Sequence, residues 1–169
     1  MALPGADVQA PTFEQLYTTQ RLALVRLAVL LVDEVPLAED IVQEAFAELH
    51  ARWSRLADPH KALAYLRTSV VNGCRSALRR RRTARAYTPP HEPPLDSPEA
   101  ELVLAEDQRE VLAAVRRLPE RQRQVLVLRY WSDMSEAEIA AALGITRGTV
   151  KSTASRALDS LERTLGGTR

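Results

Sequence analysis

The sequence predicts an all-α protein made of two small helical domains joined by a Pro-rich linker. Ala, Leu and Arg dominate the 169 residues, and all three are strong helix formers. Apolar residues recur at helical spacing, and no segment shows the alternation typical of a strand. Five prolines crowd residues 86–98, where neither helix nor strand can continue. We therefore expect domains at 12–86 and 99–166, with the linker at 87–98.

The composition argues against a disulfide-stabilised protein, a metal-binding protein and a membrane-spanning protein. The formal net charge is +1, and Cys74 is the single cysteine, so no disulfide framework can form. The three histidines are scattered and give no metal-ligand spacing: His50, His60 and His91. The longest apolar-rich run, 22–32, is too short to span a bilayer, and no signal peptide is evident. We expect a cytoplasmic protein with no membrane insertion and no cofactor or metal.

The first helix is expected from about Thr12 to Val32. Its leucines recur at helical spacing, but Val25, Val29 and Leu30 widen the apolar stripe, which predicts burial on most sides.

The second helix follows Pro36 and carries an apolar face opposite an acidic one. The acidic and polar residues are Glu39, Asp40, Gln43, Glu44 and Glu48. Like charges four residues apart repel by a few tenths of a kcal/mol per pair. Such a face either meets water or presents acids to a basic partner, and the residues alone favour the solvated face.

A loop at 54–61 precedes a third helix that begins near Lys61. Seven arginines and no acid lie between Arg67 and Arg85. Nucleic-acid backbone is the natural partner for such a face, since a helix dipole accounts for only the last one or two cations. Trp53 and Tyr65 can stack on unpaired bases, although their spacing is also that of packed core residues.

The second domain is expected to contain helices at about 98–118 and 120–131, followed by a helix-turn-helix at 135–158. Ser135 and Glu138 have the spacing of a capping box, Gly144 suits the turn, and Thr146 caps the second helix. The apolar positions predicted to be buried on that helix are Val150, Ala154, Ala157, Leu158 and Leu161. The polar residues expected to face a DNA groove are Arg147, Thr149, Lys151, Ser152, Ser155 and Arg156. An ordinary helical hairpin with a solvated face is the alternative.

Three stretches, taken together, resemble a known family. They are LAEDIVQEAF (37–46), AYLRTSVVNGCRSALRRRR (64–82) and LPERQRQVLVLRYWSDMSEAEIAAALGITRGTVKS (118–152). In this order they are similar to regions 2.2, 2.3–2.4 and 4 of the group IV, extracytoplasmic-function sigma factors of bacterial RNA polymerase. The stretch that begins RWSRLADPHK resembles the actinobacterial SigE-type subgroup.

The resemblance implies an alternative sigma factor, without an active site of its own, that binds core RNA polymerase and recognises the −35 and −10 promoter elements. It implies that the β′ clamp helices meet Glu39, Asp40, Gln43 and Glu44. The loop from Arg55 to Lys61 is then the pocket for a flipped −10 base. The residues implied in −10 binding and melting are Arg55, Lys61, Tyr65, Arg67, Asn72, Arg75, Arg79, Arg80 and Arg82.

The second domain would then read the −35 element through the six polar helix-turn-helix residues named above. The β flap would meet Val125, Leu128 or their neighbours. Family members often carry Arg or His after Ser152, where this chain has Thr153 and Ala154, so we expect fewer long donors at the base edges. An anti-sigma factor is a further expected partner.

Two other function classes are weighed against this one. A conventional helix-turn-helix repressor or activator explains 135–158 but not the acidic face or the loop at 55–61. An enzyme needs convergent Cys, His or carboxylate groups or a phosphate-binding loop, and the sequence shows none.

Overall fold

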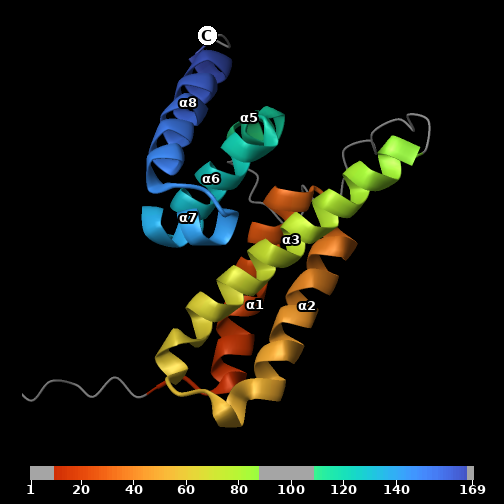
Figure 1. Cartoon of the computed structure of the whole chain (residues 1–169), viewed down its shortest axis with the longest axis vertical. Helices are drawn as coiled ribbons and strands as arrows, with labels where there is room; N and C mark the ends of the chain where they lie inside the picture. Colours follow the sequence, from red (N-terminus) through yellow and green to blue (C-terminus); the bar gives the residue numbers. More distant parts are fainter. Residues whose placement is uncertain (1–9, 88–108, 167–169) are drawn as a thin grey trace, which may run out of the picture.

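The computed structural model describes residues 10–87 and 109–166, and every regular element in these stretches is helical. In chain order they are α1 (Phe13–Val32), α2 (Val35–Arg52), two short 3-10 turns (Trp53–Arg55 and Pro59–Lys61), α3 (Ala62–Tyr87), α5 (Arg109–Arg117), α6 (Glu120–Tyr130), α7 (Glu136–Leu143) and α8 (Arg147–Gly166). Figure 1 shows α1, α2 and α3 grouped together, with the later helices gathered beside one end of that group. The all-α prediction is confirmed. Most of the predicted linker, and residues 98–108 of the helix expected at 98–118, lie outside the described residues.

The first three helices pack as a bundle around a leucine-rich core. The helices α2 and α3 pack tightly at Gly73, where an added Cβ would lie 2.7 Å from Cγ2 of Ile41. No other residue fits there unless the Ile41 side chain or one of the helices moves, because real Cβ atoms do not approach another carbon so closely. Gly73 therefore sets how α3 lies against α2.

The segment predicted as a loop at 54–61 is more ordered than expected. Two 3-10 turns fill most of it, and Asp58 accepts a hydrogen bond from the backbone N–H of His60 at 3.0 Å. Trp53 packs edge-on against Phe13 with ring centroids 5.7 Å apart, which matches the packed reading of this aromatic. Tyr65 is half-buried beneath the Arg52 guanidinium, whose carbon lies 5.9 Å from the ring centroid.

The last two helices, α7 and α8, form the predicted helix-turn-helix. Ser135 and Glu138 make the expected capping box, and Gly144 ends α7 with φ of 64°, in the left-handed region that suits glycine. Thr146 caps α8 by accepting from the N–H of Thr149 at 3.1 Å. Residues Val150, Ala154 and Ala157 are buried as predicted, but Leu158 is 39% exposed and does not belong to that core.

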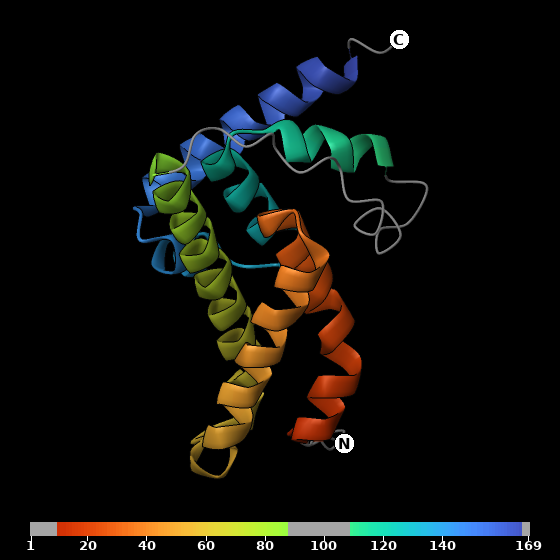
Figure 2. The same cartoon turned by 90° about the vertical axis from the view of Figure 1, so that its right-hand side faces the viewer.

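The unusual breadth of the apolar surface of α1 has a clear cause in the fold. On a helical wheel Leu24, Leu27 and Leu31 share one side, whereas Val25, Val29 and Val32 share the opposite side. Both sets are buried, because α1 packs against α2 and α3 and also against α6. Figures 1 and 2 both place α6 beside the end of α1 that leads into α2. One continuous hydrophobic core therefore joins the two halves of the described chain.

Candidate polymerase and nucleic-acid interface

The acidic face of α2 is fully available to a partner. Glu39, Asp40, Gln43 and Glu44 are all exposed, while the apolar residues on the opposite side of α2 are buried. Glu39 lies 3.7 Å from the Arg21 guanidinium, and this pair is exposed on both sides. The structure thus brings the four predicted polymerase-binding residues together on one surface.

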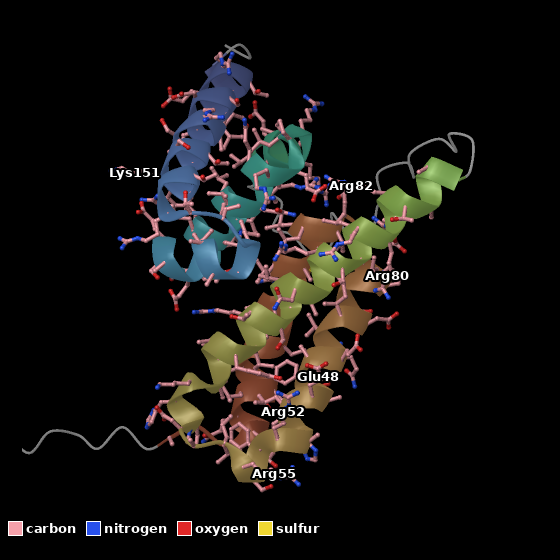
Figure 3. The ribbon with its side chains drawn as sticks, in the orientation of Figure 1. Glu48, Arg52, Arg55, Arg80, Arg82 and Lys151 are labelled. Atoms are coloured by element: carbon pink, nitrogen blue, oxygen red, sulfur yellow. The ribbon has the colours of Figure 1, made fainter. Side chains whose placement is uncertain are left out.

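A polar groove of about 340 Å³ separates this acidic face from α3. Glu44 and Glu48 line its α2 side, and Asn72 and Arg80 line its α3 side. In Figure 3 Glu48 and Arg80 mark these two helices. The groove joins one predicted polymerase contact to two predicted −10 contacts.

The 3-10 turns at the far end of the bundle present two more of the predicted −10 residues. Arg55 and Lys61 are both exposed there, and Figure 3 shows Arg55 at the end of the molecule away from α8. Tyr65, the first residue of the predicted −10 set on α3, is half-buried about one turn from the start of that helix.

The arginines of α3 do not form one free face. Arg80 turns toward the groove at α2, while Arg82 turns toward α6 and pairs with Glu120. Arg81 donates to the carbonyl oxygen of Val32 at 2.9 Å and pairs with Glu34, so it holds the turn between α1 and α2. Arg75 donates to the carbonyl oxygen of Ala142 in α7. The mutual repulsion expected for this run is thus relieved partly by groups of the same chain.

The six predicted −35 residues are all exposed on α8 or at its start. Figure 3 shows Lys151 on the outer side of α8. The hydroxyls of Thr149 and Ser152 also make local contacts, Thr149 with the Thr146 hydroxyl at 2.9 Å and Ser152 with the carbonyl oxygen of Thr149 at 3.2 Å. The long side chains of the set are therefore the donors that reach furthest from the helix.

Two sequence expectations about the second domain are wrong. Thr153 is only 7% exposed, so its side chain belongs to the core, and its small size removes no donor from the outer face of α8. Val125 and Leu128, expected to meet the β flap, are completely buried within the helical core. The exposed apolar side chains near them are those of Tyr130 and Trp131, at the end of α6.

Four groups at the junction of the two halves carry contacts that sequence reasoning missed. Asp33 lies 3.1 Å from Nε of Arg116, and Arg123 donates to the carbonyl oxygen of Leu31 at 3.4 Å. Glu120, at the start of α6, is the partner of Arg82. Burial lowers the pKa of Arg123, while the carboxylates of Asp33 and Glu120 oppose that shift. The partners come from distant parts of the sequence, and no short motif marks them.

The remaining titratable groups do not indicate catalysis. Burial raises the pKa of the Cys74 thiol to about 12, so Cys74 is a neutral core residue. No group of three or more His, Cys, Asp or Glu residues is placed to hold a metal ion in the described stretches. None of the described helices is long and apolar enough to cross a membrane.

Comparison with known families now identifies the chain. The model of Sigma-70 region 2 matches residues 16–84, and that of Sigma-70, region 4 matches residues 104–161. The RNA polymerase sigma-E factor of Streptomyces coelicolor is 40% identical over 157 residues, which cover 90% of this chain and 85% of that protein. The ECF RNA polymerase sigma factor SigM of Mycobacterium tuberculosis is 34% identical, over 91% of this chain and 77% of its own. This chain is an extracytoplasmic-function sigma factor of the sigma-70 family.

Solved structures of sigma factors have the same fold. The sigma factor RpoE of Bartonella quintana, in complex with the anti-sigma factor NepR, has a TM-score of 0.68 and 24% identity, and the match covers 93% of this chain and 98% of that one. CnrH, in complex with the cytosolic domain of CnrY, has a TM-score of 0.62 and 25% identity, over 93% and 89% of the two chains. The protein is thus an alternative sigma factor that directs promoter-specific transcription initiation, and α1–α3 and α5–α8 are called region 2 and region 4 below.

Proposed function

We propose that this sigma factor docks on the β′ clamp helices of core RNA polymerase through Glu39, Asp40, Gln43 and Glu44. The observation that carries the proposal is the exposure of all four on one side of α2, with the other side fixed in the core. A face of this kind suits a basic partner, because its like charges repel one another until cations approach. Exposed Tyr130 and Trp131 replace Val125 and Leu128 as the apolar groups we propose for the β flap.

Region 2 is proposed to hold the melted −10 strand along the 3-10 turns and α3. Extruding a base costs a few kcal/mol of stacking, so a prepared pocket and electrostatic attraction must repay it. The exposure of the cations at the turns, and the position of Asn72 and Arg80 along the groove, support this proposal.

Region 4 is proposed to read the −35 element with α8 in the major groove. Arg147, Lys151 and Arg156 are exposed, and each can reach phosphates or base edges. The buried side of α8 is formed instead by residues that include Val150, Ala154 and Ala157. We propose domain limits of 12–86 and 99–166, with the 87–98 linker between them.

A protein regulator and a cytoplasmic location complete the proposal. One structural relative was solved with the anti-sigma factor NepR, and another with the cytosolic domain of CnrY. We propose that a comparable partner covers the polymerase-facing surface of this chain. The protein acts in the cytoplasm without catalysis of its own, and the polymerase performs the chemistry.

The test is transcription with purified core polymerase on templates that include the protein's own upstream DNA. The double substitution Asp40→Arg with Glu44→Arg should abolish both core binding in a pull-down and promoter-specific transcripts. The control changes two exposed acids away from α2, Glu14→Arg with Glu162→Arg, and matches the change in net charge. Undiminished core binding by the α2 variant would contradict the polymerase assignment, and duplex DNA binding without any core binding by the unaltered chain would favour a conventional repressor or activator.

A further inference from the structure

The exposed side of α8 carries small residues along its middle and cations at its two edges. On a helical wheel Gly148, Ser152 and Ser155 lie within about 60° of one another, and all three are exposed. Lys151 and Arg156 each lie about 70° from the middle of this strip, on opposite sides of it. No long side chain therefore stands between the α8 backbone and a surface that meets the strip.

The fold itself gives no reason for the glycine at position 148. An added Cβ would have Oγ1 of Thr146 as its nearest neighbour, at 3.8 Å, and the backbone of Gly148 is not left-handed. A glycine inside a helix makes that helix less stable than an alanine would. The advantage of a bare backbone at Gly148 therefore lies in a complex, where it lets α8 approach a DNA groove closely.

Asp159 continues the same strip one turn further along α8. It follows Ser155 by four residues and Ser152 by seven, and these spacings place side chains on one face of a helix. Asp159 is exposed, and it is the first acidic residue of α8. Phosphates repel a carboxylate in this position, so Asp159 weakens DNA binding unless the DNA offers it a hydrogen-bond donor.

The carboxylate of Asp159 is not paired with a cation of its own helix. Arg156 precedes it by three residues and Arg163 follows it by four, the spacings at which ion pairs form on a helix. Arg163 instead donates from Nε to the backbone carbonyl oxygen of Asp159 at 3.2 Å, and from Nη2 to Oγ of Ser160 at 3.3 Å. Within the described stretches no Lys, Arg or His forms an ion pair with the Asp159 carboxylate.

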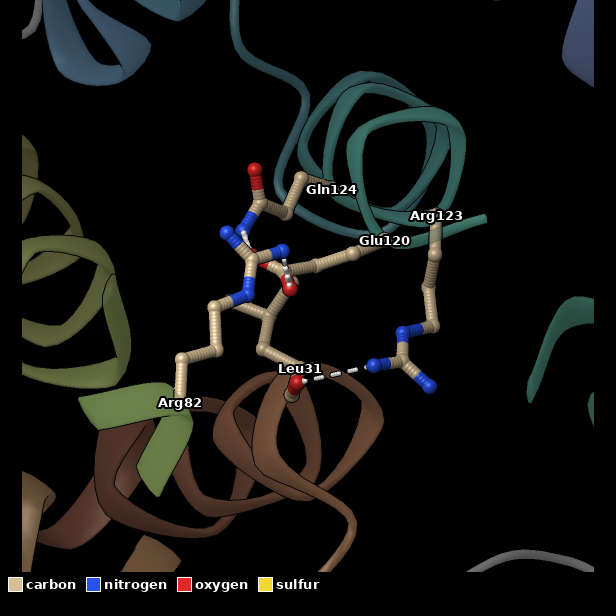
Figure 4. A network of polar contacts seen from close by, with 5 residues as sticks. All are labelled: Leu31, Arg82, Glu120, Arg123 and Gln124. Carbon is tan, nitrogen blue, oxygen red and sulfur yellow. Dashed lines mark hydrogen bonds and ion pairs between the residues drawn. The ribbon is translucent and has the colours of Figure 1, made fainter. Parts of the chain in front are cut away.

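Two other acids of region 4 show the contrast. Glu120 pairs with Arg82, as Figure 4 shows, and Glu136 pairs with Arg129 at 3.2 Å. Both carboxylates are thus engaged by groups of the same chain. The carboxylate of Asp159 keeps its oxygens available for a donor from outside.

A carboxylate can only accept hydrogen bonds, and this restricts which bases it tolerates in the major groove. The donors there are the N4 amine of cytosine and the N6 amine of adenine, whereas guanine and thymine present acceptors. Asp159 lies about 17 Å along α8 from Gly148, which corresponds to roughly five base-pair steps. A side chain at that distance meets one edge of the bases that α8 covers.

We propose that Asp159 is a specificity-determining residue of region 4, which accepts a hydrogen bond from the exocyclic amine of a cytosine or adenine at one edge of the −35 element. The inference rests on the proposed placement of α8 in the major groove. The small residues of the strip bring α8 close enough for this short side chain to reach base edges. Lys151 and Arg156 attract the phosphates on the two sides of the groove, and guanine or thymine opposite Asp159 is rejected.

The main experiment uses the full chain assembled with core polymerase and a library of the protein's own upstream DNA in which the −35 region is randomised. Sequencing of the bound DNA gives the base preference at each position. The unaltered chain should prefer an amine-bearing base at one edge position. Asp159→Asn should reduce that preference roughly fivefold or more and leave the others unchanged, because an amide can also donate to guanine or thymine.

Glu162→Gln is the control for the loss of one negative charge from an exposed site on α8. It should leave every base preference as it is in the unaltered chain. Identical base preferences for Asp159→Asn and the control would overturn the proposal, even if both variants bind all sequences more tightly, because the acid would then only repel DNA. Failure of the proposed function gives a different result, in which the unaltered chain shows no base preference anywhere in the −35 region.

A second measurement tests the hydrogen bond itself. In the preferred sequence the amine-bearing base is replaced by an analogue that lacks the amine, and binding is compared for the unaltered chain and Asp159→Ala, each with core polymerase. Loss of the amine should weaken binding about fivefold more for the unaltered chain than for Asp159→Ala. Equal losses would overturn the proposal. Both Asp159 variants should keep the Tm of the unaltered chain, since the side chain is exposed and unpaired.

Discussion

The arginine side of α3 and the outer side of α8 are the two basic surfaces of this sigma factor, and they differ in what they touch. Arg75 and Arg82 on α3 are engaged by Ala142 and Glu120 of region 4. All six predicted −35 residues on α8 are exposed. The surface proposed to read a duplex is thus exposed in the isolated chain, whereas part of the surface proposed to hold a melted strand is in contact with region 4.

The packing of α3 on α2 depends on Gly73. Among the predictions, substitution of this glycine should change the free energy of unfolding most. Gly73→Ala places a Cβ 2.7 Å from Ile41 Cγ2 and should destabilise the protein by about 1–3 kcal/mol, the range for overpacked cores. In region 4, the nearest atom to an added Cβ at Gly148 is Thr146 Oγ1 at 3.8 Å, so Gly148→Ala should stabilise by about 0.5 kcal/mol. Thermal and urea unfolding measure both. Equal stabilities for the two variants would mean that α2 and α3 can separate at no cost.

Removing one cation from each basic surface tests whether the two surfaces differ in how freely they bind DNA. Lys151→Ala should weaken duplex binding about tenfold, the worth of one charge-assisted hydrogen bond of roughly 1.4 kcal/mol. It should also lower the slope of log K against log salt by about 1. Arg82→Ala should weaken single-strand binding less than Lys151→Ala weakens duplex binding, because Glu120 already neutralises part of the Arg82 charge.

Fluorescence anisotropy over a salt series, with labelled duplex and single strand, measures these effects. Arg163→Ala, near the end of α8, is the control for loss of one positive charge. A loss of single-strand binding by Arg82→Ala as large as the loss of duplex binding by Lys151→Ala would show that Glu120 does not neutralise the Arg82 charge.

Local signals in the sequence predicted most of the helices. Thr12, Ser135 and Thr146 each mark a helix start, and Gly144 marks the turn, because caps and left-handed glycines depend on neighbours within a few residues. The extra valines of α1 predicted burial on most sides. They could not indicate that region 4 provides the cover, since periodicity reports which face is buried but not by what.

The predicted core was wrong at the edge of the apolar stripe of α8. Leu158 has helical spacing with Ala154 but lies outside the core, and Thr153, a polar residue, lies inside it. Helical spacing alone does not separate neighbouring positions at the edge of a stripe. The pair of Arg82 with Glu120 joins residues 38 apart in the sequence, so no local signal could reveal it. The predicted residues on α2 and α8 are exposed, as their proposed roles require, and their binding remains a prediction.

The smallest predicted effect concerns the capping boxes of α1 and α7, which should differ in how their contribution to stability depends on pH. At α1 the Thr12 N–H donates to Gln15 Oε1 at 2.9 Å, and at α7 the Ser135 N–H donates to Glu138 Oε2 at 2.8 Å. Hydrogen bonds from Ser135 lower the pKa of Glu138 below its usual 4.5, with help from Arg67, whereas the Gln15 amide does not titrate.

A carboxyl with a depressed folded pKa contributes stability that is present above its unfolded pKa and is lost as pH falls through the folded value. Glu138→Gln should therefore reduce the acid sensitivity of unfolding below about pH 4.5, by about 0.3 kcal/mol for so exposed a group. Gln15→Glu should add a comparable sensitivity to α1. Urea unfolding between pH 3 and 7 measures both, and identical pH profiles for Glu138→Gln and the unaltered chain would show that the charge of Glu138 contributes nothing beyond its hydrogen bonds.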